Sequence, residues 1–243
     1  MTNLKFFLGY PVKFKKLCSV FPPTVEDAVS LDEFSIYQGL LTMSQEDIED
    51  QMKDQHLQTY PTPLEALLGN AYYNDKIKAL LKEAFKFFIH EEVNFLFDQK
   101  AILIGNIEEV LANAKTMDDL RLINEENFFD FQNLVRESCG LKAAEKPNPN
   151  ENPKIKRMKA LARERDRIKA KSGQGIRFDT TIVSICCMNL GLNPLNIGKL
   201  SYCALTQLMN TYQKKEKYQL DIDSLLAGAD SKKVKPKYWI NNE

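Results

Sequence analysis

The residue types that most often carry catalysis are scarce in this chain of 243 residues. Histidine occurs only at His56 and His90, and no arrangement of serine, histidine and acid stands out from the spacing. Neither a glycine-rich dinucleotide motif nor a phosphate-binding Gly-Lys-Ser/Thr motif is present. We therefore expect no catalytic residue, no cofactor site and no enzymatic activity.

The residues that could bind a metal also lack a recognisable spacing. The five cysteines form no Cys-x-x-Cys pair, and Cys186 and Cys187 lie in an apolar stretch that favours buried thiols. Residues 44–54 carry carboxylates at helical spacing, but acids are favoured in any first helical turn by the helix dipole. The sequence therefore predicts no metal site and reduced thiols, as in the cytoplasm.

The C-terminal strip, residues 231–242, has the composition of a docking segment. It holds the only tryptophan of the chain and four closely spaced lysines. Aromatic side chains are enriched in interface hot spots, and lysines steer towards an acidic partner. We predict partner binding by six of its residues: Lys232, Lys233, Lys235, Lys237, Tyr238 and Trp239. The alternative is a frayed terminus.

A basic helix is predicted at residues 154–171, which contain nine basic residues and two acidic ones. Because each neutralised phosphate adds affinity, one interpretation is a nucleic-acid-binding regulator. Its contacts would be Lys156, Arg157, Arg163, Arg167 and Lys171. The zero net charge of the chain and the lack of aromatic residues among these bases favour a solvated helix or an acidic protein partner instead.

The elements that would position these residues are mostly helical. Residues 12–17 alternate with period two, which predicts a small N-terminal β element, and residues 4–8 form a further apolar run that we expect to be extended. A β-hairpin is predicted near 93–104. Three helix starts are marked by Thr24, Ser44 and Thr62, each with an acid three residues later.

Helices are predicted from the 3.6-residue period over most of the remaining chain. Their approximate ranges are 30–41, 44–53, 75–90, 106–113, 117–122, 125–138, 153–172, 179–190, 201–217 and 221–228, and a further helix starts at Pro63. Gly140 is the expected end signal of the helix at 125–138.

The clearest boundary in the chain is residues 145–153, which contain three prolines and three asparagines. We predict a mixed α/β N-terminal domain at 1–144, a linker at 145–153 and an all-helical C-terminal domain at 154–243. The expected fold class is α+β and predominantly helical. No apolar run reaches the length of a membrane span, and residues 1–21 lack the apolar core of a signal peptide, so we expect a cytoplasmic location without a membrane partner.

Several phrases of the sequence resemble tail or baseplate assembly chaperones of bacteriophages that infect low-GC Gram-positive hosts. They are GYPVKF and VFPPTVED near the start, TPLEALL and FKFFIHEEVNFLFDQKAILIGN in the middle, INEENFFDFQNLVRESCGL after them, and the long C-terminal stretch from ICCMNLGLNPLNIGKLSYCALTQLMN to LLAGADSKKVKPKYW. The resemblance touches both halves of the chain.

The resemblance implies a non-enzymatic role and carries over no catalytic residue. Such proteins bind other tail components, commonly the tape measure, in the host cytoplasm during assembly, and an oligomer is possible. The alternative within this class is a structural baseplate or tail component that stays in the virion.

Overall fold

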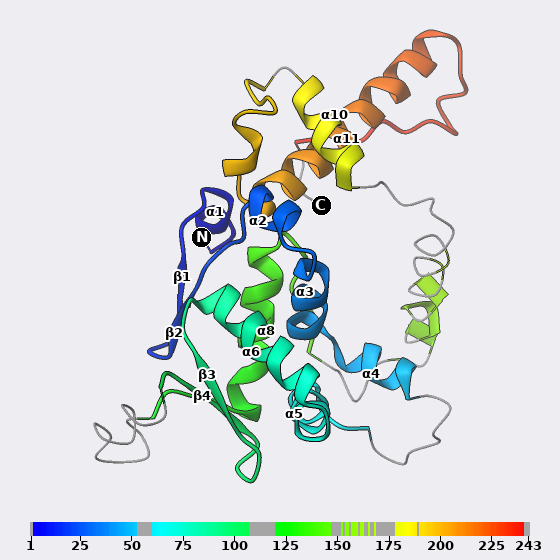
Figure 1. The fold of residues 1–243 in the computed structure, drawn as a ribbon. Helices are drawn as coiled ribbons and strands as arrows, with labels where there is room; N and C mark the ends of the chain where they lie inside the picture. The colour runs from blue at the N-terminus through cyan, green and yellow to red at the C-terminus, as the bar shows by residue number, and fades with distance from the viewer. Residues whose placement is uncertain are drawn as a thin grey trace.

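The computed structural model describes residues 2–52, 60–106, 120–146, 178–188 and 190–240, with scattered residues between 152 and 168 (Figure 1). The described helices and strands confirm an α+β fold that is predominantly helical. In chain order they are α1 (Thr2–Phe7), β1 (Val12–Phe14), β2 (Cys18–Val20), α2 (Val25–Ser30), α3 (Phe34–Thr42), α4 (Gln45–Gln51), α5 (Pro63–Tyr73), α6 (Asp75–Ile89), β3 (Val93–Leu96), β4 (Ala101–Ile104), β5 (Leu122–Ile123), α8 (Glu125–Ser138), α10 (Phe178–Cys187), η3 (Ile197–Lys199) and α11 (Tyr202–Leu226).

The N-terminal β element is a two-stranded antiparallel ladder of β1 and β2, with Val12 opposite Val20. The prediction of an extended run at residues 4–8 is wrong, because these residues belong largely to α1. A short apolar run has no periodicity that separates a strand from a helix. In the helical form Phe6 is buried in the core while Leu4 and Leu8 stay exposed.

All three predicted helix starts are confirmed as reciprocal capping boxes. The side chains of Thr24, Ser44 and Thr62 accept hydrogen bonds from backbone N–H groups three residues later. The acids at those later positions accept hydrogen bonds from the backbone N–H of the cap residues. Each box satisfies donors that the first helical turn would otherwise leave unpaired.

The predicted hairpin is confirmed as β3 and β4, with Val93 opposite Ile104 and Leu96 opposite Ala101. A third strand, β5, pairs with β4 through Leu122 and Ile123. The helix predicted at 117–122 is therefore wrong over residues 120–122, and residues 117–119 lie outside the described residues, as does most of the helix predicted at 106–113. A two-residue strand has no periodicity to detect, so only its tertiary partner defines it.

Arg121, which directly precedes β5, connects the two small sheets. Its guanidinium donates to the carbonyl oxygens of Leu17, in the β1–β2 turn, and of Ile104, in β4, at 3.1 and 3.4 Å. It also forms a bidentate ion pair with the carboxylate of Glu91. The arginine therefore fixes the two ladders relative to each other.

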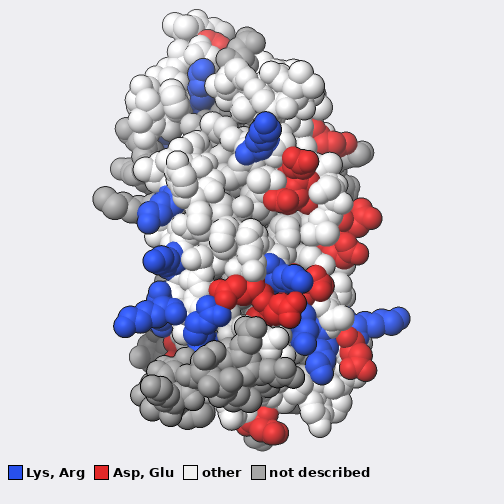
Figure 2. Space-filling view, turned by 60° about the vertical axis from the view of Figure 1, so that its left-hand side comes forward, with Lys and Arg blue, Asp and Glu red and all other residues white. Residues whose placement is uncertain are grey.

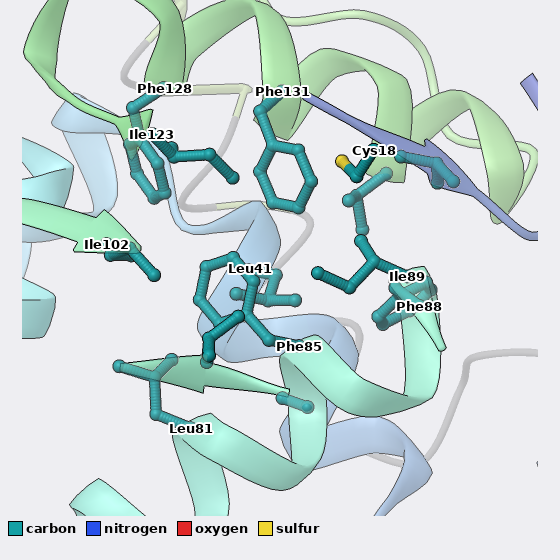
Figure 3. Packing of buried hydrophobic residues seen from close by; sticks show 14 of the residues in the cluster. Cys18, Leu41, Leu81, Phe85, Phe88, Ile89, Ile102, Ile123, Phe128 and Phe131 are labelled. Carbon is teal, nitrogen blue, oxygen red and sulfur yellow. The ribbon is translucent and has the colours of Figure 1, made fainter. Parts of the chain in front are cut away.

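The main core lies between α6 and α8 and is rich in phenylalanine (Figure 3). The rings of Phe85 and Phe131 stack with centroids 5.4 Å apart, and Phe14 meets Phe131 edge-on at 5.6 Å. Phe131 and Phe85 are completely buried. Their stacking places the apolar face of α6, predicted from its period, against α8.

In the C-terminal part, the helices predicted at 201–217 and 221–228 are one continuous helix, α11. No glycine or proline stands between Lys217 and Asp221, so nothing in the backbone ends the helix there. Only the first turns of α11 are buried, and the helix then extends away from the N-terminal part of the fold (Figure 1).

The start of α11 is joined to the N-terminal part by backbone hydrogen bonds. Thr24 and Ser201 form an isolated antiparallel bridge, flanked by bonds from Val25 N–H to the Leu200 carbonyl (2.9 Å) and from Tyr202 N–H to the Pro23 carbonyl (2.8 Å). The buried hydroxyl of Ser201 donates to the Phe7 carbonyl and accepts from the Ala204 N–H, which caps α11. The division into two domains stays a prediction.

Most of the predicted linker and basic helix lies outside the described residues. Those that are described between 154 and 168 are helical and exposed. Within the described part of the chain, no helix is both long and apolar enough to span a bilayer.

Gly140, which follows the C-cap residue Cys139 of α8 as the expected left-handed end signal, also allows close approach of α11. Its φ of +70° lies in the left-handed region, and a Cβ built there would stand 2.8 Å from Cβ of Thr206 and 3.3 Å from Cα of Cys203. Gly140 therefore has both a conformational and a packing role.

Replacing Gly140 with alanine should lower the free energy of unfolding more than the same change at Gly9. Gly9 has a similar φ of +81°, but a Cβ there meets nothing within 4 Å. Gly9→Ala should cost on the order of 1 kcal/mol for the left-handed backbone. Gly140→Ala should cost roughly 1–3 kcal/mol more, because α8 and α11 must move apart. Urea unfolding of both variants measures the difference, and equal losses would contradict the packing role.

Candidate partner-binding site

The C-terminal strip turns back along α11 after the helix ends (Figure 1). Its described residues, 231–240, are not helical. Between the strip and α11 lies a cavity of about 470 Å³, which we call the cationic pocket. It lies within the C-terminal part of the chain, beyond the turns of α11 that contact the N-terminal core.

Five of the six residues predicted to bind a partner line the cationic pocket: Lys233, Lys235, Lys237, Tyr238 and Trp239. Lys232 is exposed and does not line it. The backbone N–H of Lys232 instead donates to the Asp230 carboxylate at 2.9 Å, which shapes the turn into the strip. The composition of the strip therefore identified residues that the structure brings together.

The other wall of the pocket comes from α11 and was not predicted. It consists of Lys214, Lys217, Tyr218 and Asp221. These positions follow the spacing i, i+3, i+4 and i+7, which places all four on one face of a helix. That spacing is visible in the sequence. It indicates one wall of a pocket only once the C-terminal strip is known to return along the helix.

Aromatic contacts hold the strip against α11. The rings of Tyr218 and Tyr238 meet edge-on with centroids 5.5 Å apart, and Tyr238 lies 6.2 Å from the Trp239 ring. Tyr238 remains 48% exposed and Trp239 is half-buried. Part of each aromatic surface is therefore available to a ligand.

The charge of the pocket is strongly positive. Five lysines line it, with Asp221 as the single acid. None of the ion pairs found in the described part of the chain involves these lysines. A neighbouring hollow of about 400 Å³ shares Lys214 and Lys217 and adds Lys142. A set of like charges with so little compensation favours an anionic ligand.

Although the chain has zero net charge, its charged side chains are therefore unevenly distributed over the surface. On the face drawn in Figure 2, acidic side chains are most numerous towards the right-hand edge, while basic ones lie on both sides. Local clusters of one charge give a neutral protein distinct surfaces for partners of either charge.

The expectation of buried thiols at Cys186 and Cys187 is wrong at Cys187, which is exposed, and Cys186 is only partly buried. The other three cysteines and His90 have surroundings that favour a structural role. Burial raises the pKa of the Cys18 and Cys139 thiols to about 12 and also raises that of Cys203. These thiols are neutral and weakly nucleophilic near pH 7. His90 ends α6 with φ of 57° and stacks on Phe21 at 3.9 Å. In the described ranges no group of three or more His, Cys, Asp or Glu is placed to hold a metal ion.

Of the predicted basic-helix residues, Arg157 is described and is exposed on a helix. Lys156, Arg163, Arg167 and Lys171 lie outside the described residues. The role of this set therefore stays a prediction.

Comparison with known proteins gives one match. Residues 169–243 match a family model described as "YomV second domain". The matched stretch covers less than a third of the chain and includes every residue that lines the cationic pocket. The family comes from a phage protein, so the match is consistent with a phage-related role. No curated protein and no solved structure matches the chain.

Replacing Tyr218 with alanine should loosen the strip and change the emission of Trp239, the only tryptophan. Without the ring that packs on Tyr238, Trp239 should become more exposed and its fluorescence should shift to longer wavelength. The melting temperature should change little, because this part of α11 lies outside the core.

Tyr212→Ala is the matched control, since Tyr212 lies on α11 but does not line the pocket. Its emission should equal that of the unmodified protein. An unchanged spectrum for Tyr218→Ala would show that this contact does not hold the strip.

Proposed function

We propose that this protein is a non-enzymatic assembly factor for phage tails or baseplates. It binds other tail proteins, such as the tape measure, in the host cytoplasm during assembly. The observation that carries the proposal is the cationic pocket with its partly exposed aromatic rings, which lies inside the segment that matches a phage-protein domain. The resemblance of both halves to tail assembly chaperones supports it further.

The pocket favours an acidic segment that also presents an apolar or aromatic side chain. Lysines on both walls attract carboxylates over the distance that salt screening allows. Tyr238 and Trp239 offer the broad, rigid surface that is typical of interface hot spots. Binding of this kind needs no reacting group and no cofactor.

Nucleic acid is a second candidate ligand, since lysines interleaved with aromatic rings also occur in single-strand binding sites. That observation applies to the cationic pocket, whereas the described part of the basic helix presents no aromatic residue. Salt dependence separates the two candidates. The logarithm of the affinity for single-stranded DNA should fall linearly with the logarithm of the salt concentration. The slope should be steep and proportional to the number of phosphates contacted.

Mass spectrometry of purified particles and of infected-cell lysate tests the assembly role. For an assembly factor, the protein should be abundant in lysate of the phage that encodes it and absent from finished particles. A phage that lacks the gene should accumulate heads without tails. Recovery in particles at a fixed ratio to other tail proteins would instead identify a structural tail or baseplate component.

A further inference from the structure

A second surface of the molecule has the opposite charge. A groove of about 410 Å³ lies between the start of α4, the start of α5 and one side of α8. Its apolar wall includes Met43, Pro63, Phe128 and Phe129. We call it the acidic groove because of the residues at its edge.

Four carboxylates line the acidic groove: Glu46, Glu125, Glu126 and Glu145. Two cationic side chains also line the groove, and each already has a partner within the chain. Arg136 donates to the carbonyl oxygens of Thr42 and Lys142 at 2.8 and 2.9 Å, and Lys146 lies over the Phe129 ring at 5.6 Å. The groove therefore combines an apolar wall with an excess of negative charge.

The described residues between 154 and 168 have the complementary character. Ile155, Met158, Leu161 and Ile168 fall on one side of the helix and are 50%, 64%, 53% and 56% exposed. Lys154, Arg157 and Lys159 are exposed beside them. A basic helix with an uncovered apolar stripe is the kind of segment that lies in an apolar groove.

One contact shows that the two charge sets can pair. Nζ of Lys159 lies 2.8 Å from Oε2 of Glu145, at the edge of the groove. Within a single chain this contact leaves the apolar stripe exposed and the groove open. A helix from another molecule would cover both surfaces.

We propose that the acidic groove binds the basic helix of a second copy of this chain, so that the protein self-associates. The apolar stripe meets the wall formed by Met43, Pro63 and the two phenylalanines, while the lysines and arginine face the carboxylates. This inference does not depend on the proposed function. It adds to it, because an assembly with several cationic pockets gains avidity for a partner with repeated acidic segments.

Sedimentation velocity of the full chain over a range of concentrations tests the proposal. The unmodified protein should associate as its concentration rises. Met158→Asp, at an exposed position, should raise the dissociation constant about tenfold or more, because a charge would enter the apolar wall. Glu126→Lys with Glu145→Lys should have a similar effect. Adding Lys154→Glu and Arg157→Glu to that groove variant should restore association.

The control is Glu83→Lys with Asp98→Lys, which reverses two exposed acids elsewhere and should leave association unchanged. Circular dichroism confirms that each variant is folded. A monomer at all concentrations would overturn the proposal, as would association that survives the groove and helix variants. Binding of a synthetic peptide of residues 154–171 to a protein that remains monomeric would also overturn it, since the groove would then accept the helix of its own chain rather than that of a second copy.

Discussion

The arrangement of the N-terminal and C-terminal parts of the chain depends on the side chain of Ser201. Its hydroxyl caps α11 and at the same time donates to the Phe7 carbonyl at the end of α1. Ser201 is 4% exposed, so an unpaired hydroxyl there would be costly. Because the backbone on either side bonds to Pro23 and Val25, the direction of α11 is set from its first residue.

The geometry of the cationic pocket follows from that constraint. α11 is anchored over its first turns, where Cys203 is in the main core and Leu205 packs with Val25, Ile185 and Ile197. Gly140 lets α8 approach the same turns closely. The rest of α11 is exposed and serves as the fixed wall along which the C-terminal strip returns. A ligand in the pocket therefore lies beyond the N-terminal core but on a helix whose first turns pack against that core.

The sequence was informative where local interactions decide the structure. The capping boxes at Thr24, Ser44 and Thr62 depend on residues three positions apart, and all were predicted. The hairpin at 93–104 was predicted for the same reason, whereas β5 was missed because β4 alone defines it. The single helix α11 was divided because its exposed second half lacks a clear apolar face.

The candidate site shows the same division between local and tertiary information. Lysines and aromatic residues in the strip indicated a docking segment, and most of them do line the pocket. The wall from α11 was missed because its role depends on the contact between Tyr218 and Tyr238, which joins segments twenty residues apart. The acidic groove is assembled from segments still farther apart, so no single stretch of sequence reveals it.

Titration monitored by Trp239 fluorescence tests the central claim most directly, because no other tryptophan contributes. An oligo-glutamate peptide should change the emission saturably at about 50 mM salt, and an oligo-lysine peptide of equal length should not. Lys233, Lys235 and Lys237 changed together to glutamine should weaken binding about tenfold, at roughly 0.5 kcal/mol for each exposed charge. The same change at Lys5, Lys13 and Lys16 should have little effect. A flat titration, or equal weakening by both triple variants, would contradict an acidic partner in the pocket, and tighter binding of oligodeoxythymidylate would indicate nucleic acid instead.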